Sequence, residues 1–169
     1  MLRKIIKKEG GFTLLELLIV IVIIGILALL IIPNITSAPK KARDTQRKTD
    51  LRAIQKGLEE YFVSNNTYPV SATAATADTV LGGTTSGTGS GPLNNAQNSN
   101  TPIMKTIPTD PKSSSGAPYQ YGYQSASGST YTLSACLENA GDNGTDTDVA
   151  NKALLGTCTT RSFMLYNNN

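Results

Sequence analysis

The sequence predicts an α+β fold in which a long N-terminal helix packs on a small antiparallel sheet. An unbroken apolar run opens the chain, an amphipathic helical pattern follows it, and alternating tyrosines mark strands further on. These features divide the 169 residues into four parts: a leader (1–11), the helix (12–64), a flexible connecting loop (65–106) and a sheet domain (107–169).

The composition argues against an enzyme. The chain has no histidine and two cysteines, which removes the commonest general base and most zinc sites. Its net charge of +3 lies entirely in the first eleven residues. The rest of the chain is neutral, with a basic helix and an acidic C-terminal half, so the basic isoelectric point does not predict binding to nucleic acid. We expect no catalytic residues and no cofactor.

The segment 12–32 has the length of a membrane-spanning helix. Every residue from Leu17 to Ile32 is apolar or glycine. As an α-helix, residues 12–32 would extend about 31 Å, close to the roughly 30 Å hydrocarbon core of a bilayer. Signal peptides have shorter apolar regions of about 7–15 residues, and a cut after Ala38 would leave Pro39 behind the scissile bond. We therefore predict a single membrane span.

Glu16 is an anion next to this apolar run. A carboxylate costs about 2.5–3.5 kcal/mol near the centre of a bilayer and less near its surface. One interpretation is a glutamate that reaches the membrane surface. The other is a carboxylate that is compensated by a positive group when subunits assemble.

The motif GGFTLLE (residues 10–16), with a basic leader before it and an apolar run after it, resembles the class III signal of type IV pilins. The resemblance covers residues 8–33. It implies that a prepilin peptidase cleaves between Gly11 and Phe12, that Phe12 becomes N-methylated, and that Glu16 assists assembly through the N-terminal amine of a neighbouring subunit. Cleavage would create a cation one helical turn from Glu16.

If the chain is a pilin, as the resemblance implies, it is the structural subunit of a type IV pilus. Such a pilus is a homo-polymeric helical filament built through the apolar helix. The chain would wait in the cytoplasmic membrane as a single-pass prepilin, be processed by the peptidase, join the pilus assembly platform and end in a filament on the cell surface. Adhesion, twitching motility and DNA uptake would belong to the filament and its machinery.

Two alternatives remain open for the function. The first is a pseudopilin of a type II secretion or competence system, which IPTDP followed by PYQYGY also resembles. The second is a single-span, membrane-anchored binding module that never polymerises.

The helix is expected to continue beyond the membrane segment and to end near residue 64. Pro33 removes a hydrogen bond and Gly25 lowers helix stability, so we expect kinks at both, as at the matching positions of pilins. Pro39 leaves two interpretations open: one continuous helix, or a break at which Ser37 caps a new helix. Beyond it, apolar residues at steps of three and four form one stripe that needs a sheet as its partner: Leu51, Ile54, Leu58, Tyr61 and Phe62.

Basic residues occupy the other faces of the helix between residues 40 and 56. They could meet lipid head groups or acidic surfaces of neighbouring subunits. A DNA-binding stripe is the disfavoured interpretation, because the segment lacks interleaved aromatic residues and any nucleic-acid motif.

The second half of the chain carries the strand signals. Residues 82–91 are all Gly, Ser or Thr, which predicts a flexible loop. Alternation predicts strands at 119–124 and 130–137, paired as an antiparallel hairpin, and a third strand at 161–166. We expect the tyrosines to form a core and cross-strand ladder, with a ligand platform as the alternative.

Cys136 and Cys158 lie 22 positions apart. In an exported domain an even pair predicts a disulfide, whereas a cytoplasmic chain would keep two thiols. A C-terminal region enclosed by a disulfide is also typical of the pilins that the chain resembles.

Between the cysteines, the segment DNGTDTD alternates oxygen-bearing residues around a glycine. It predicts either an ordinary surface turn or a Ca²⁺ site. Some secretion pseudopilins bind calcium in a C-terminal loop. The ligands would be Asp142, Asn143, Asp146 and Asp148.

Overall fold

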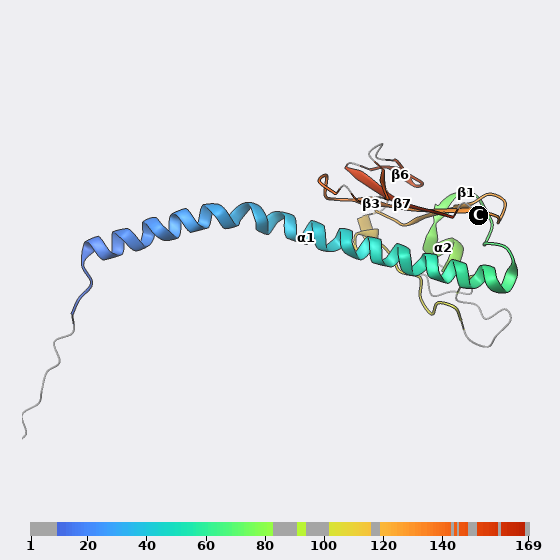
Figure 1. The fold of residues 1–169 in the computed structure, drawn as a ribbon, viewed down its shortest axis with the longest axis horizontal. Coiled ribbons are helices and arrows are strands. Elements are labelled where there is room, and N and C mark those ends of the chain that lie inside the picture. The colour runs from blue at the N-terminus through green and yellow to red at the C-terminus, as the bar shows by residue number, and fades with distance from the viewer. Residues whose placement is uncertain are drawn as a thin grey trace, which may run out of the picture. The chain divides into compact units, whose positions relative to one another are not determined.

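The computed structural model confirms an α+β fold with a long N-terminal helix and an antiparallel sheet (Figure 1). It describes residues 10–82, 91–93, 102–115, 119–142, 144, 146–148, 152–158 and 160–167, without the side chains of residues 30–36, 147–148, 152–153 and 157. The chain divides into two compact units, Met1–Ala38 and Pro39–Asn169.

Helix α1 (Leu14–Asn65) is the longest element and includes parts of both units. It ends where Asn66 adopts a left-handed backbone, with φ of 56°. The N–H of Asn66 donates to the carbonyl of Phe62 at 2.8 Å, which satisfies one of the free carbonyls of the last turn. The predicted end of the helix near residue 64 is therefore confirmed.

Of the two interpretations of Pro39, the structure has the continuous helix, because the α-helical backbone continues through Gly25, Pro33 and Pro39. A proline inside a helix removes one hydrogen bond and costs about 3 kcal/mol. α1 tolerates this cost at Pro39 because its later turns are held by packing on the sheet. The kinks at Gly25 and Pro33 stay predictions.

The predicted membrane segment 12–32 extends into residues whose side chains lie outside the described part. Among the described residues, no helix combines the length and the apolar character that crossing a membrane requires.

The main sheet is antiparallel and has five strands in the order β1-β2-β3-β7-β4. A separate two-stranded sheet, β5-β6, lies between β4 and β7 in the sequence. The bounds of the strands are β1 Ser71–Thr76, β2 Gly122–Ser125, β3 Tyr131–Leu137, β4 Thr147–Asp148, β5 Lys152–Ala153, β6 Gly156–Thr157 and β7 Arg161–Asn167. The predicted hairpin and the third strand are confirmed, although β2 begins at Gly122, three residues after the predicted start.

The segment 65–106 was predicted as a loop, but its described residues include two regular elements. Strand β1 lies at the edge of the main sheet, and helix α2 (Ala77–Gly82) follows it directly. The sequence SATAAT of β1 has no large apolar residue. It therefore lacks the apolar alternation by which a half-buried strand is predicted, and an edge strand can do without it. Part of the predicted flexible loop, residues 83–90, lies outside the described residues.

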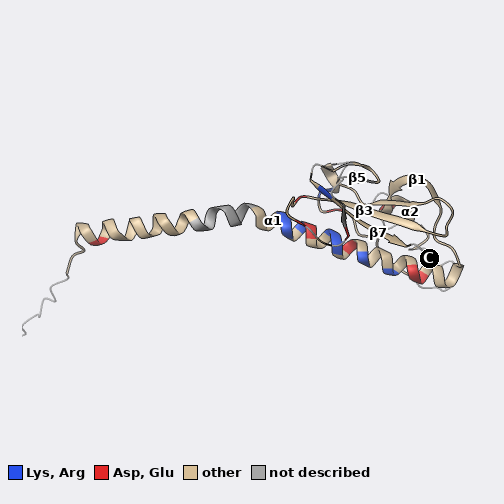
Figure 2. Ribbon diagram, turned by 45° about the horizontal axis from the view of Figure 1, so that its top comes forward, with Lys and Arg blue, Asp and Glu red and all other residues tan. Residues whose placement is uncertain are grey.

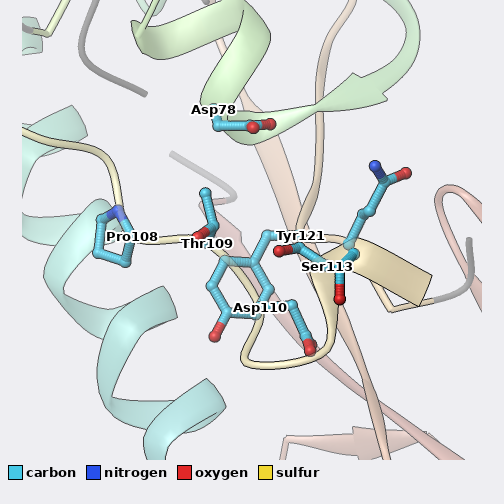
Figure 3. A pocket seen from close by; sticks show the side chains of 8 residues that line it. Asp78, Pro108, Thr109, Asp110, Ser113 and Tyr121 are labelled. Carbon is cyan, nitrogen blue, oxygen red and sulfur yellow. The ribbon is translucent and has the colours of Figure 1, made fainter. Parts of the chain in front are cut away.

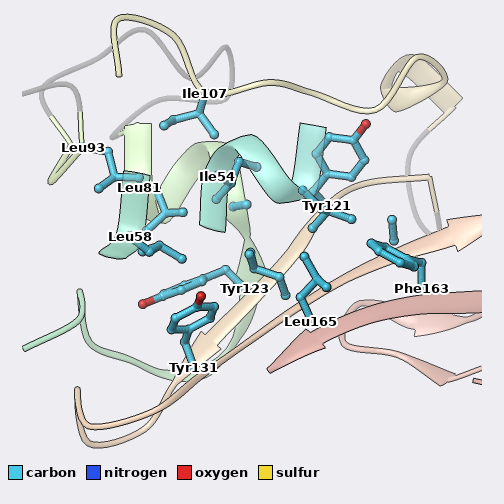
Figure 4. Packing of buried hydrophobic residues seen from close by; sticks show 14 of the residues in the cluster. Ile54, Leu58, Leu81, Leu93, Ile107, Tyr121, Tyr123, Tyr131, Phe163 and Leu165 are labelled. Carbon is cyan, nitrogen blue, oxygen red and sulfur yellow. The ribbon is translucent and has the colours of Figure 1, made fainter. Parts of the chain in front are cut away.

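The core lies between the sheet and the second half of α1 (Figure 4). Leu51, Ile54 and Leu58 of the predicted stripe are fully buried, and Tyr61 and Phe62 pack against the same cluster. From the sheet side, the core receives Tyr121, Tyr123, Tyr131, Leu133, Phe163 and Leu165. The predicted tyrosine ladder is confirmed, since the rings of Tyr123 and Tyr131 stack with centroids 6.3 Å apart.

Cys136 and Cys158 form the expected disulfide, which joins β3 to the segment before β7. Replacing both cysteines by serine is expected to lower the free energy of unfolding by about 3 kcal/mol, because the bridge limits the conformations of the unfolded chain. Urea unfolding of the full chain in detergent measures this change. Reducing agent should shift the unfolding midpoint of the wild type and leave that of the double variant unchanged; equal midpoints for both proteins would contradict the prediction.

Candidate processing and assembly site

The peptide bond between Gly11 and Phe12 lies in an exposed segment without regular structure. Residues 10–13 precede α1, and all of them are exposed, Phe12 to 87%. A protease binds its substrate in an extended form, so a bond just ahead of a helix is accessible to one. The other predicted leader residues, 1–9, lie outside the described residues.

Glu16 and Thr13 close the N-terminus of α1 with a reciprocal pair of hydrogen bonds. The backbone N–H of Thr13 donates to the Glu16 carboxylate at 2.9 Å, and the backbone N–H of Glu16 donates to the Thr13 hydroxyl oxygen at 3.2 Å. The Thr13 hydroxyl also donates to the carboxylate, at 2.8 Å. This arrangement is a capping box, and its T-x-x-E spacing is visible in the sequence.

The capping box defines where Glu16 lies relative to the predicted cleavage site. Its carboxylate contacts the backbone N–H of Thr13, the residue that follows Phe12. A cut between Gly11 and Phe12 would therefore place the new amine one residue from the N–H that this carboxylate already binds. The assembly role predicted for Glu16 concerns the amine of a neighbouring subunit, so this contact within one chain does not test it.

An exposed apolar surface follows the capping box. The large apolar side chains of residues 12–29 are all exposed, from 48% at Leu18 to 87% at Phe12. Soluble monomers rarely expose continuous apolar patches of this kind, and such patches mark contacts with other molecules. This part of α1 therefore has the surface of an element that another apolar partner covers.

In the globular unit, a network of buried ions attaches the second half of α1 to the head, the part of this unit that follows α1. The Arg47 side chain is fully buried. It donates to both carboxylate oxygens of Asp110, at 2.7 and 3.0 Å, to Asp44 at 2.8 Å and to Glu138 at 2.9 Å. A buried guanidinium needs such partners, because an uncompensated charge is costly in the protein interior.

Asp44 and Arg43 complete the network on the side of β3. Asp44 accepts the backbone N–H groups of Glu138 and Asn139, at 2.9 and 2.8 Å, just after the strand ends. Arg43 binds both carboxylate oxygens of Glu138, each at 2.7 Å. The hydrogen bonds from Arg43, assisted by Arg47, hold the pKa of Glu138 at about 2, well below its usual value of 4.5.

The lowered pKa of Glu138 predicts how stability depends on pH. Because the folded protein binds the proton of Glu138 less readily than the unfolded chain, this contribution is complete above about pH 4.5 and is lost as the pH falls toward 2. Glu138→Gln should flatten this part of the profile, measured as urea midpoints from pH 6 to 2.5. The exposed Glu60→Gln variant should keep the wild-type profile; the same profile for both variants would contradict the prediction.

The basic residues predicted between 40 and 56 therefore have two different roles. Arg43, Arg47 and Lys48 pair with carboxylates of the head, Lys48 with Asp142 at 2.5 Å. Figure 2 shows that basic residues recur along this part of α1. Lys40, Lys41, Arg52 and Lys56 are exposed, and of these Arg52 makes a long ion pair with Asp146.

The residues predicted as Ca²⁺ ligands do not form a metal site in the described part. Asp142 pairs with Lys48, and Asp146 pairs with Arg52 at 3.5 Å, so cations of α1 already compensate both carboxylates. Asn143 and the side chain of Asp148 lie outside the described residues. Among those described, there is no cluster of three or more acidic, cysteine or histidine residues that could hold a metal ion.

Comparison with models of known protein families gives two matches, one for the N-terminal segment and one for most of the globular unit. The model of the prokaryotic N-terminal methylation motif matches residues 6–32, which include the predicted cleavage site and Glu16. The model of type II secretion system protein G matches residues 34–152, most of the globular unit. The first match defines a prepilin-type protein, with the N-terminal signal of the type IV pilin family.

Complete relatives define the family more closely. The type II secretion system core protein G of Pseudomonas aeruginosa is 33% identical, over 86% of this chain and 96% of that protein. The protein of the same name from Vibrio cholerae is 33% identical, over 88% and 94%. The Escherichia coli protein is 44% identical over 62 residues, 37% of this chain and 43% of that protein. No solved structure matches this chain. The chain belongs to the type II secretion system protein G family.

Proposed function

We infer that this chain is a pseudopilin, a structural subunit of the fibre of a type II secretion system. The observation that carries the proposal is an exposed apolar helix that begins with a capped glutamate and follows a methylation motif. Full-length similarity to proteins named type II secretion system core protein G supports it. The function predicted first from the sequence, a type IV pilus subunit, is less well supported than this alternative.

The chain would act in three steps. Residues 12–32 would hold the precursor in the cytoplasmic membrane, with the globular unit outside. A prepilin peptidase would cleave between Gly11 and Phe12, and Phe12 would be methylated. Copies would then polymerise through the exposed apolar surface of α1, with the globular units on the outside of the fibre. Such a subunit carries no catalytic residue; the energy for assembly would come from another protein.

Burial of apolar surface away from water would not by itself drive the polymerisation. Each buried aliphatic side chain contributes about 1.5–3 kcal/mol relative to water, but in a bilayer these side chains are already away from water. Helix packing and the compensation of Glu16 by the new amine would therefore decide whether a subunit leaves the membrane.

Two measurements test the proposal. Mass spectrometry of the purified protein should find an N-methylated Phe12 at its N-terminus. Cells in which the gene is deleted should fail to export their secreted proteins. Expression of the wild-type chain should restore this export without producing long surface filaments. An intact Met1 would support a membrane-anchored binding module instead. Normal export together with lost surface filaments and twitching would support a pilus subunit.

A further inference from the structure

A small polar pocket lies on the globular unit (Figure 3). The first turn of α2, the segment 108–114 and the residues before β2 surround it, and its volume is about 210 Å³. Pockets for drug-sized ligands usually measure about 300–1,000 Å³. This pocket therefore has room for a single side chain or a small group.

One uncompensated charge lies in the wall of the pocket. Asp110 already binds Arg47 through both of its oxygens, and the Tyr121 hydroxyl donates to Asp50 at 2.8 Å. Asp78 also lines the pocket, in the first turn of α2. In the described part of the chain, its carboxylate has neither an ion pair nor a side-chain hydrogen bond.

The other polar groups of the wall are neutral and can accept hydrogen bonds. Thr109, Ser113, Ser114 and Gln120 line the pocket, and in the described part their side chains make no hydrogen bond. One carboxylate surrounded by hydroxyl and amide oxygens suits a primary ammonium, which carries one positive charge and three donors. An anion would be repelled by Asp78, and a divalent metal needs more anionic ligands than the single free carboxylate provides.

The chain itself presents such ammonium groups on one face of α1. Positions three and four apart share a face of a helix, and one stripe of exposed residues has this spacing: Lys41, Thr45, Thr49, Arg52, Lys56, Glu60 and Val63. The two threonine hydroxyls donate to the backbone carbonyls of Lys41 and Thr45, at 2.9 and 3.0 Å. Because these threonine side chains are short, they leave the lysine side chains accessible.

The lysines of this stripe have no acidic partner in the part of their own chain that the structure describes. Lys48 and Lys112, by contrast, pair with Asp142 and Glu138. Lys41 and Lys56 are exposed, and no ion pair within the described residues involves them. The pocket with its free carboxylate and the helix face with its free lysines are therefore two surfaces of the same chain with complementary charge.

We propose that the Asp78 pocket binds the ammonium group of a lysine from the exposed stripe of α1 on a second copy of this chain. The contact rests on the proposed polymerisation and adds to it a lateral connection between globular units, remote from the apolar segment. Each subunit then carries one pocket and one lysine-bearing stripe, so the same contact can repeat along a fibre.

Chemical cross-linking of assembled fibres tests the contact. A carbodiimide couples a carboxylate to an amine only where the two are in contact, so treated fibres should yield a peptide in which Asp78 is joined to Lys41 or Lys56. Asp78→Asn should remove this product, whereas Lys105→Gln, which removes an exposed amine outside the stripe, should retain it.

Charge exchange gives a second readout. Asp78→Lys should reduce fibre yield, by roughly two- to fivefold, the range of a partly exposed ion pair, and Lys56→Glu or Lys41→Glu in the same chain should restore it. Fibres that form normally without any Asp78 linkage, or whose yield Asp78→Lys leaves unchanged, would overturn the pocket contact and leave the proposed function intact. Absence of fibres from the wild-type chain would overturn the proposed function itself. Cross-links from Asp78 to a different protein would overturn the choice of a second copy.

Discussion

Replacing Glu16 by alanine is expected to abolish fibre assembly while membrane insertion and cleavage after Gly11 continue. The variant loses the anion that would compensate the new amine of a neighbouring subunit, and a charge left uncompensated in an apolar phase costs several kcal/mol. It also loses the capping box with Thr13, which contributes about 0.5–2 kcal/mol to a helix terminus. Fibre yield and the N-terminal mass of the processed protein measure the two effects separately.

Thr13→Ala is the matched control for this experiment. It removes the hydroxyl that accepts the N–H of Glu16 but keeps the carboxylate, so it should weaken the helix terminus and still allow fibres. If Glu16→Ala assembles as well as the wild type, the assembly role of the carboxylate is refuted. If Thr13→Ala is as defective as Glu16→Ala, helix capping rather than charge compensation explains the effect.

Replacing Arg47 by methionine should destabilise the globular unit by about 3–5 kcal/mol, because it leaves buried carboxylates without their cation. Asp110 would lose both hydrogen bonds to the guanidinium, and Asp44 and Glu138 would lose one each. Methionine keeps most of the side-chain volume, so a cavity contributes little. Urea unfolding of the full chain in detergent, followed by the tyrosine signal in near-ultraviolet circular dichroism, measures the loss.

Arg52→Met provides the comparison for Arg47→Met. Arg52 lies on the same helix, but its side chain is 61% exposed and its pair with Asp146 is 3.5 Å long, so its loss should change stability by less than about 0.5 kcal/mol. Adding Asp110→Asn to Arg47→Met should recover part of the stability, since it removes an uncompensated buried charge. Equal unfolding midpoints for Arg47→Met and Arg52→Met would contradict the importance of the network.

The candidate site was predicted from the sequence to different extents in the two units. Gly11, Phe12 and Glu16 were found because the signal is continuous in the chain. The capping role of Thr13 has the same local character, yet it was missed, although its spacing from Glu16 is visible in the motif. In the globular unit, the disulfide was found because the chain has only one pair of cysteines.

The polar part of the head was interpreted less well. Arg43 and Arg47 were grouped with the exposed bases of the helix, since charged residues usually face solvent. Asp142 and Asp146 were considered as metal ligands, whereas the structure pairs them with Lys48 and Arg52. Opposite charges on distant segments carry no pattern that identifies their partners.

The sequence by itself determined the N-terminal helix, the stripe that faces the core and the strands with large alternating side chains, because these depend on residues within a few positions of one another. Only the tertiary structure decided that Arg47 is buried, that β1 forms the edge of the sheet and that Asp78 lines a pocket. The reason is distance along the chain: Arg47 and Asp110 are 63 positions apart, and such pairs meet only when the sheet has closed on α1.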